Sequence, residues 1–156
     1  MKKFSFPLHT VLNYKQQVLD NLRNEQAQII SDIFKAEKRI EDLQNQNRSW
    51  AKELQEKQTK GMTVREMGTY ANYLSNLQAR EKLEKEALTR LEERKEKKRQ
   101  EVVAAKTETA SIELLKEKKF AQYEYEVQKS EEQFIEEFVS NVRSRMMAQE
   151  QRVELG

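Results

Sequence analysis

The sequence predicts an all-α protein: a long antiparallel two-helix coiled coil, or helical hairpin, whose second helix is longer than the first. Three observations support this fold class. The 156 residues include only 3 glycines and 1 proline, the residues on which most turns depend. Charged residues make up 36% of the chain, and the good helix formers Glu, Lys, Gln, Arg, Leu and Ala dominate its composition. Apolar residues recur at heptad spacing. We therefore expect a single coiled-coil domain over residues 1–156.

The first helix is expected over about residues 5–59. Ser5 can cap its N-terminus, and Pro7 suits a first helical turn because its missing N–H would have no helical partner. From Leu12 onward two columns form a seam that predicts a left-handed supercoil, with Gln26 and Asn47 as polar residues that set the register. The columns are Leu12, Leu19, Gln26, Ile33, Ile40, Asn47 and Leu54, and Lys15, Leu22, Ile29, Ala36, Leu43, Trp50 and Lys57.

A turn is expected at about residues 60–63. Gly61 suits the left-handed residue that closes a helix C-terminus. Thr63 and Glu66 have capping-box spacing, and Met62 and Met67 stand at the hydrophobic-staple positions around that box. The two helices should fold back here, which places residue i opposite roughly residue 124 minus i.

The second helix is expected over about residues 64–149. Its seam is weaker and includes charged positions: Tyr70, Leu74, Leu77, Glu81, Glu84, Leu88, Leu91, Lys95, Lys98, Val102, Ala105, Thr109 and Ile112. After Ile112 the apolar phase slips, as in a stutter. From about residue 120 the first helix is too short to supply a partner. This C-terminal overhang is nevertheless apolar, and an unpartnered apolar stripe is typical of a partner surface.

Catalysis and cofactor binding find little support in the sequence. There is no cysteine, a single histidine (His9) and no glycine-rich phosphate loop, and the paired carboxylates lie on a solvated coiled coil. We therefore expect no enzyme, no catalytic residue, no metal and no cofactor. No apolar run is long enough to span a membrane, and no signal peptide is recognisable, so a cytoplasmic location without direct membrane insertion is expected.

Two surface features have competing interpretations. The basic tract at residues 94–99 alternates with glutamate, and the net charge is only +2, so we expect no nucleic-acid partner and favour an acidic protein partner. The aromatic cluster of Trp50, Tyr70 and Tyr73 near the turn either fills the wider end of the coiled coil or anchors a partner.

Several stretches resemble the flagellar export protein family FliJ. The opening Phe4-x-Phe6-x-Leu8-x-x-Val11-Leu12 is similar to the N-terminal signature of the family. The junction Gly61-Met62-Thr63-Val64-Arg65-Glu66-Met67, followed by Tyr70-x-x-Tyr73-Leu74-Ser75-Asn76-Leu77, is similar to its central turn. The stretch Lys116-Glu117-Lys118-Lys119-Phe120 and the acidic, aromatic residues after it resemble the C-terminal part.

This resemblance implies a non-enzymatic stalk of the flagellar type III protein export apparatus, needed for motility, at the cytoplasmic face of the inner membrane beneath the flagellar basal body. The implied partners are the hexameric export ATPase FliI and the export-gate protein FlhA, with FliH and export chaperones as further partners. The terminal end would contact the ATPase through Phe4, Phe6, Leu8, Phe120, Tyr123, Val127, Phe134, Phe138 and Val142. The turn-proximal end would contact the gate through Arg39, Leu43, Gln46, Trp50, Tyr73 and Leu77, with Arg80 and Glu84 beside them. Two alternatives stay open: a homo-oligomeric scaffold, and the equivalent stalk of a virulence secretion system.

Overall fold

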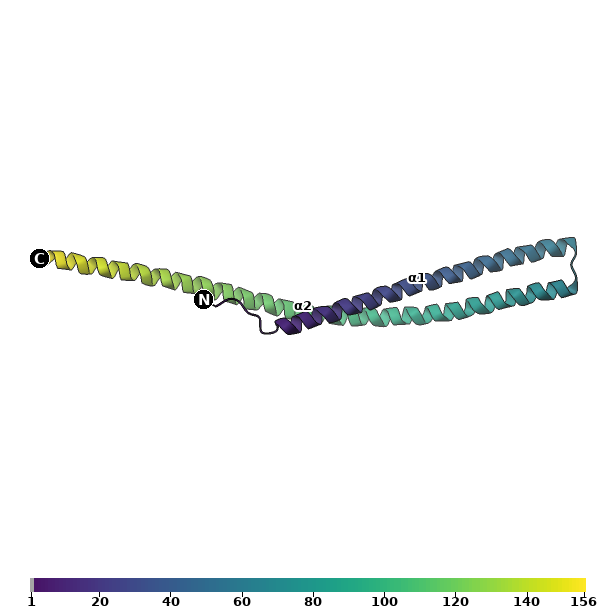
Figure 1. Cartoon of the computed structure of the whole chain (residues 1–156), viewed down its shortest axis with the longest axis horizontal. Coiled ribbons are helices and arrows are strands. Elements are labelled where there is room, and N and C mark those ends of the chain that lie inside the picture. The colour runs from purple at the N-terminus through teal and green to yellow at the C-terminus, as the bar shows by residue number, and fades with distance from the viewer. Residues whose placement is uncertain (1) are drawn as a thin grey trace. The chain divides into compact units, whose positions relative to one another are not determined.

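The computed structural model describes residues 2–156, and within this range it is entirely helical apart from short connecting segments. Helix α1 runs over His9–Lys60 and helix α2 over Val64–Glu154 (Figure 1). The predicted all-α fold class is confirmed. The chain divides into two compact units. The hairpin unit is Gln16–Thr107, and the terminal unit joins the N-terminal residues up to Lys15 to Glu108–Gly156.

Within the hairpin unit, α1 and α2 run side by side in opposite directions (Figure 1). Its buried apolar residues all occupy predicted seam positions: Leu19, Ile29, Ile33, Ala36, Ile40 and Leu77. Cross-helix contacts report the register. Lys98 donates to Glu25, Arg39 donates to Glu84, and the Tyr70 hydroxyl donates to Glu53. The residue numbers of each pair add to 123. The register expected from the position of the turn is therefore confirmed to within one residue.

Charged residues in the seam of α2 are accommodated by polar partners on both helices. Glu81 accepts a hydrogen bond from Gln44 at 2.9 Å and pairs with Lys85 at 2.9 Å. Lys98 lies between Glu25 at 2.7 Å and Glu101 at 2.8 Å. Among the described side chains, no buried nitrogen or oxygen lacks a hydrogen-bond partner. The polar seam positions therefore interrupt the apolar stripe without leaving an unsatisfied buried group.

The turn between the helices follows the predicted capping chemistry. Gly61 has φ = +94°, a conformation that side chains with a Cβ disfavour. The backbone N–H of Glu66 donates to the Thr63 hydroxyl at 3.2 Å, which satisfies one free donor of the first turn of α2. Met62 is half-buried beside this cap, whereas Met67 is exposed, and their staple contact remains a prediction.

The terminal unit begins with a non-helical stretch, residues 2–8, which ends in a turn at Pro7 and Leu8 and which we call the N-terminal segment. Helix α1 starts at His9 and not near Ser5, because Pro7 disfavours the helical conformation in the residue before it. Phe6 is buried, and its carbonyl accepts the N–H of His9 at 3.1 Å. At the other end α2 continues to Glu154, five residues beyond the expected end, since neither glycine nor proline interrupts residues 69–155.

Candidate functional site

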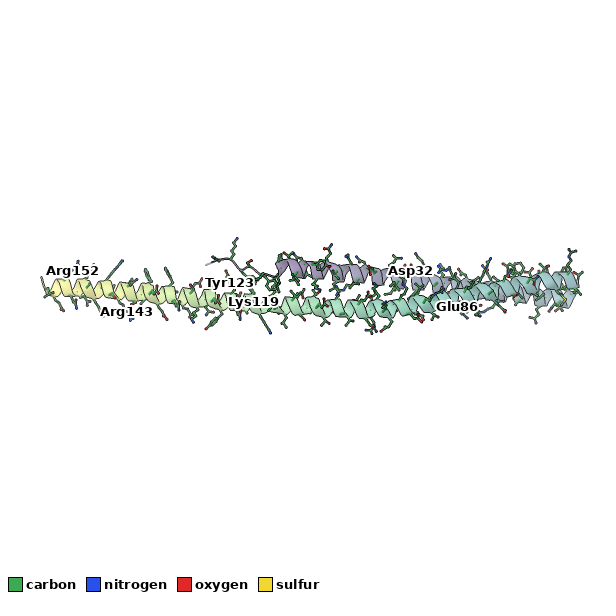
Figure 2. All side chains as sticks on the ribbon, turned by 90° about the horizontal axis from the view of Figure 1, so that it is seen from below. Asp32, Glu86, Lys119, Tyr123, Arg143 and Arg152 are labelled. Atoms are coloured by element: carbon green, nitrogen blue, oxygen red, sulfur yellow. The ribbon has the colours of Figure 1, made fainter. Side chains whose placement is uncertain are left out.

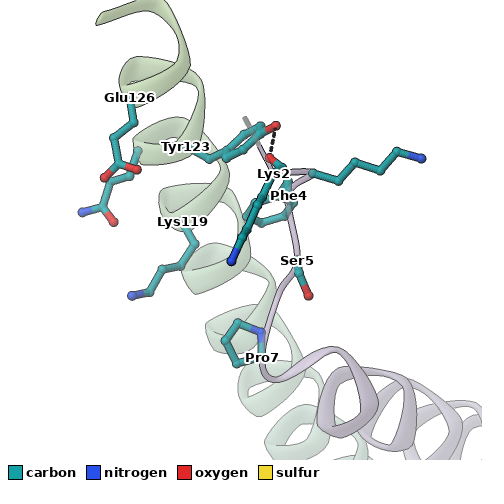
Figure 3. Close-up of a pocket in the computed structure, with 9 residues that line it drawn as sticks. Lys2, Phe4, Ser5, Pro7, Lys119, Tyr123 and Glu126 are labelled. Atoms are coloured by element: carbon teal, nitrogen blue, oxygen red, sulfur yellow. Dashed lines mark hydrogen bonds between the residues drawn. The ribbon is translucent and has the colours of Figure 1, made fainter. Parts of the chain in front are cut away.

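The N-terminal segment packs against α2 within the terminal unit. The Phe4 ring lies edge-on to Phe120, with centroids 5.1 Å apart and planes at 76°, and 5.6 Å from the Tyr123 ring. The Tyr123 hydroxyl donates to the carbonyl of Lys2 at 2.9 Å (Figure 3). The expectation that α2 lacks an intramolecular partner from about residue 120 is therefore wrong for Phe120 and Tyr123. The unpartnered length of α2 begins only after these residues.

An open groove of about 540 Å³ lies between the N-terminal segment and α2. Phe4 and Tyr123 form its aromatic part, and Lys2, Lys3 and Lys119 bring three positive charges to it (Figure 3). Glu126 is the acidic residue among those that line it. Sequence reasoning missed this groove because it depends on the path of a short non-helical segment. Its chemistry suits an acidic partner segment that also carries an apolar side chain.

The rest of α2, from Val127 to Glu154, is the free stretch. Among the described residues of the terminal unit, 2–15 and 108–156, no other segment lies beside it, and Figure 2 shows side chains projecting above and below the helix around Arg143 and Arg152. Phe134 is 70% exposed, and Ile135, Phe138, Val139, Met146 and Met147 are exposed as well. Val127 and Val142 are half-buried. A large apolar surface on a single solvated helix is typical of a site that another chain covers.

The predicted terminal residues thus fall into two groups. Phe4 and Phe6 are held against the rest of the terminal unit, with Phe120 and Tyr123 as the partners of Phe4. Phe134 and Phe138 stand free in solvent, and Leu8 is partly exposed. The free stretch therefore offers the larger accessible apolar surface.

The aromatic cluster near the turn both packs and stays accessible. Trp50 lies 4.7 Å from Tyr73 and 5.7 Å from Tyr70 between ring centroids. The ammonium of Lys57 sits 5.1 Å above the Tyr70 ring, a cation–π contact. Tyr73 keeps 41% of its surface exposed, so its outer side can touch a partner. Packing and partner binding are thus compatible at this cluster.

A groove of about 360 Å³ lies on the hairpin unit, where it is lined by residues of both α1 and α2. Two of its lining residues, Arg39 and Leu43, were predicted to contact the gate, and two more, Arg80 and Glu84, were expected beside them; Asp42 and Leu83 complete the lining. Leu83 is 64% exposed and was missed by sequence reasoning, since it lies outside the seam columns. Leu77, in contrast, is only 2% exposed. It can support the surface from below but cannot offer its side chain to a partner while the seam is closed.

Two side chains of the basic tract are neutralised by neighbouring acids. Arg99 makes two hydrogen bonds to Glu96, at 2.7 and 2.9 Å, and these bonds lower the pKa of the Glu96 carboxyl. Hydrogen bonds to Glu101 and Glu25 raise the pKa of Lys98. These cations are therefore less available to phosphates than the sequence alone indicates.

The remaining chemistry of the described chain is limited. Residues 2–156 hold no group of three His, Asp or Glu side chains placed to bind a metal ion. His9 contacts the side chain of Asn13 at 3.3 Å on the exposed face of α1. No helix in this range is long and apolar enough to cross a membrane.

An antiparallel helical hairpin with exposed apolar and aromatic contact surfaces defines a coiled-coil protein of the structural and coupling class. Comparison with protein families then gives its identity. The family model described as flagellar FliJ protein matches residues 4–153, and the chain belongs to this family. It is therefore a component of flagellar protein export. Searches of curated proteins and of solved structures gave no significant match.

Proposed function

We propose that the chain is the non-enzymatic stalk of the flagellar type III export apparatus. In this proposal the terminal unit binds the hexameric export ATPase FliI, and the hairpin unit binds the export-gate protein FlhA near its turn. The protein would work in the cytoplasm beneath the basal body, with FliH and export chaperones as additional partners. The observation that carries the proposal is the apolar free stretch on a member of the FliJ family.

The physical argument concerns symmetry. A single asymmetric helix inside a ring of six subunits cannot make six equivalent contacts. Subunits that touch different faces of the helix bind it with different free energies, and this difference biases their nucleotide states. The free stretch has such unlike faces, since the exposed Phe134 and Phe138 lie on one side of the helix, whereas Glu132 and Glu136 lie on the opposite side.

The first experiment tests the contact with the ATPase. Purified protein added to FliI should increase hexamer formation and ATP hydrolysis, whereas the doubly substituted Phe134→Glu, Phe138→Glu protein should do neither. Phe34→Glu is the matched control, because Phe34 is 69% exposed on α1 of the hairpin unit, almost the same as Phe134. Circular dichroism checks that each variant remains helical. Absent stimulation by the wild type, or equal stimulation by wild type and double variant, would contradict the proposed contact.

The second experiment tests the contact with the gate. Trp50→Ala and Tyr73→Ala should weaken binding to the cytoplasmic part of FlhA and leave ATPase stimulation unchanged. Tyr125→Ala is the control, since Tyr125 is an exposed tyrosine of the terminal unit. Loss of both activities in the Trp50 and Tyr73 variants would indicate a folding defect. Unchanged FlhA binding would remove these residues from the gate surface.

A further inference from the structure

The free stretch carries a second heptad seam. Its positions repeat with spacings of four and three residues, as in the hairpin unit: Ile135, Val139, Val142, Met146, Gln149 and Val153. Ile135, Val139 and Met146 are exposed, and Val142 is half-buried on the helix surface. A seam of this kind is stabilised only when a second helix covers it.

We propose that the second helix is the free stretch of another copy of this chain, bound antiparallel, with residue i opposite roughly residue 281 minus i. Val139 then faces Val142 of the second copy, and Ile135 faces Met146 of the second copy. As in the hairpin unit, residues of one seam column face residues of the other column. Glu132 and Gln149 meet as a polar pair near the edge of the paired region.

The charges beside the seam select this arrangement. In an antiparallel coiled coil, the residues that flank the seam pair with residues in the same kind of position on the other helix. Here the residues directly after the column of Ile135 and Val142 face one another across the two copies. The residues directly before the column of Val139 and Met146 do the same. In the proposed register Glu136 faces Arg143 of the second copy and Lys129 faces Glu150 of the second copy. On the other edge Glu131 faces Arg152 of the second copy. Twofold symmetry repeats each of these opposite-charge pairs.

Other registers are less favourable. Because the seam must stay in contact, the register can change only by whole heptads. A shift of one heptad in one direction places Glu136 opposite Glu136 of the second copy and Lys129 opposite Arg143 of the second copy. A shift of one heptad in the other direction places Arg143 opposite Arg143 of the second copy and Glu136 opposite Glu150 of the second copy. A parallel pair keeps Arg145 beside Glu150 but sets Glu131 against Glu136. Like charges at these positions destabilise a coiled coil.

The terminal unit has room for this pairing. Glu154 of one copy lies opposite Val127 of the other, which is four residues beyond Tyr123. The N-terminal segment, held by Phe120 and Tyr123, therefore stays in place. The paired region covers Val142 and one side of Phe138. The pairing itself does not depend on the proposed function. If the proposed function is correct, self-pairing and ATPase binding use the same surface and compete, so the dimer holds chains that are not bound to the ATPase.

Sedimentation equilibrium of the full chain between 1 and 200 µM tests the pairing, where we expect a reversible monomer–dimer equilibrium on the order of micromolar to tens of micromolar. Val139→Glu should leave the chain monomeric over this range. Val103→Glu is its control, because Val103 is an exposed valine in the hairpin unit. A wild-type chain that stays monomeric at 200 µM, or a Val139→Glu chain that dimerises like wild type, would overturn the proposal.

Charge exchange tests the register. Glu136→Arg alone and Arg143→Glu alone should each raise the dimer dissociation constant about tenfold, because two opposite-charge pairs become like-charge pairs. An equimolar mixture of the two variants should recover wild-type affinity, since opposite charges face each other again in the mixed dimer. Glu86→Arg, an exposed site in the hairpin unit, should change nothing. A mixture no tighter than its two components would rule out this register. ATPase stimulation is measured separately, so failure of the proposed function is distinguishable from failure of the pairing.

Discussion

Docking of the N-terminal segment can be tested by truncating its main contact, Phe120. Phe120→Ala removes the edge-on contact with Phe4, which contributes about 0.5–1.5 kcal/mol. It also removes the buried part of the Phe120 side chain, which is 43% exposed, and this lost apolar burial costs about 1 kcal/mol. Together these terms amount to about 2 kcal/mol, or a roughly thirtyfold larger population of the undocked segment. Helix α2 itself should persist, since alanine is the better helix former.

Limited tryptic cleavage after Lys2 and Lys3 measures this population, because the rate of cleavage follows the open fraction when opening and closing are fast. Phe120→Ala leaves the cleaved sequence unchanged and should accelerate cleavage roughly thirtyfold. Phe134→Ala, the same truncation in the free stretch, should leave the rate as in wild type. Equal cleavage rates for Phe120→Ala and wild type, or equal acceleration by both variants, would refute the docking contact.

Three further predictions concern stability, each read from urea unfolding followed by circular dichroism. Gly61→Ala should destabilise the fold by about 1–2 kcal/mol, because Gly61 has φ = +94°. Gly68→Ala should instead stabilise α2 by about 0.5–1 kcal/mol, since nothing lies within 4 Å of the added Cβ. Equal effects of the two substitutions would contradict this explanation from backbone conformation. Leu77→Ala should cost about 2–5 kcal/mol, because Leu77 is the largest fully buried side chain among those described, and a cost below about 1 kcal/mol would mean that the seam is open there. Glu81→Gln should destabilise the protein at neutral pH, because hydrogen bonds from Gln44 and then Lys85 lower the pKa of the Glu81 carboxyl in the folded chain. A lowered pKa contributes stability above the unfolded value of about 4.3 that is lost as the pH falls, so the difference from wild type should shrink toward pH 3, and a constant difference would contradict this assignment.

The hairpin was predictable because its determinants repeat or are local. Seam residues such as Leu19 and Ile33 recur with a fixed period, so the position of each residue in the sequence places it on the buried face. The turn at Gly61 and Thr63 depends on chemistry within a few residues of the chain. Once the turn is placed, the register follows by counting, since neither helix is interrupted by proline.

The candidate surfaces were only partly predictable. Phe134 and Phe138 could be assigned to the unpartnered part of α2 because that assignment needs only helix lengths and the position of the turn. The heptad pattern separated Leu77, a seam position, from Leu83, which lies outside the seam columns, but it did not show that Leu83 lines a groove. Their exposure, 2% and 64%, depends on how α2 is rotated about its axis against α1.

The sequence by itself determined the two helices, the turn between them, the seam and the family, because each depends on periodic or local patterns. Only the tertiary structure decided where the unpartnered part of α2 begins. Phe4 meets Phe120 and Tyr123, and Tyr123 bonds to Lys2 across 121 positions of the chain. The N-terminal segment has no heptad period, so the number of a residue within it does not predict which part of α2 it contacts. The path of the backbone before Pro7 brings these rings together, and this contact leaves Val127–Glu154 as the surface open to a partner.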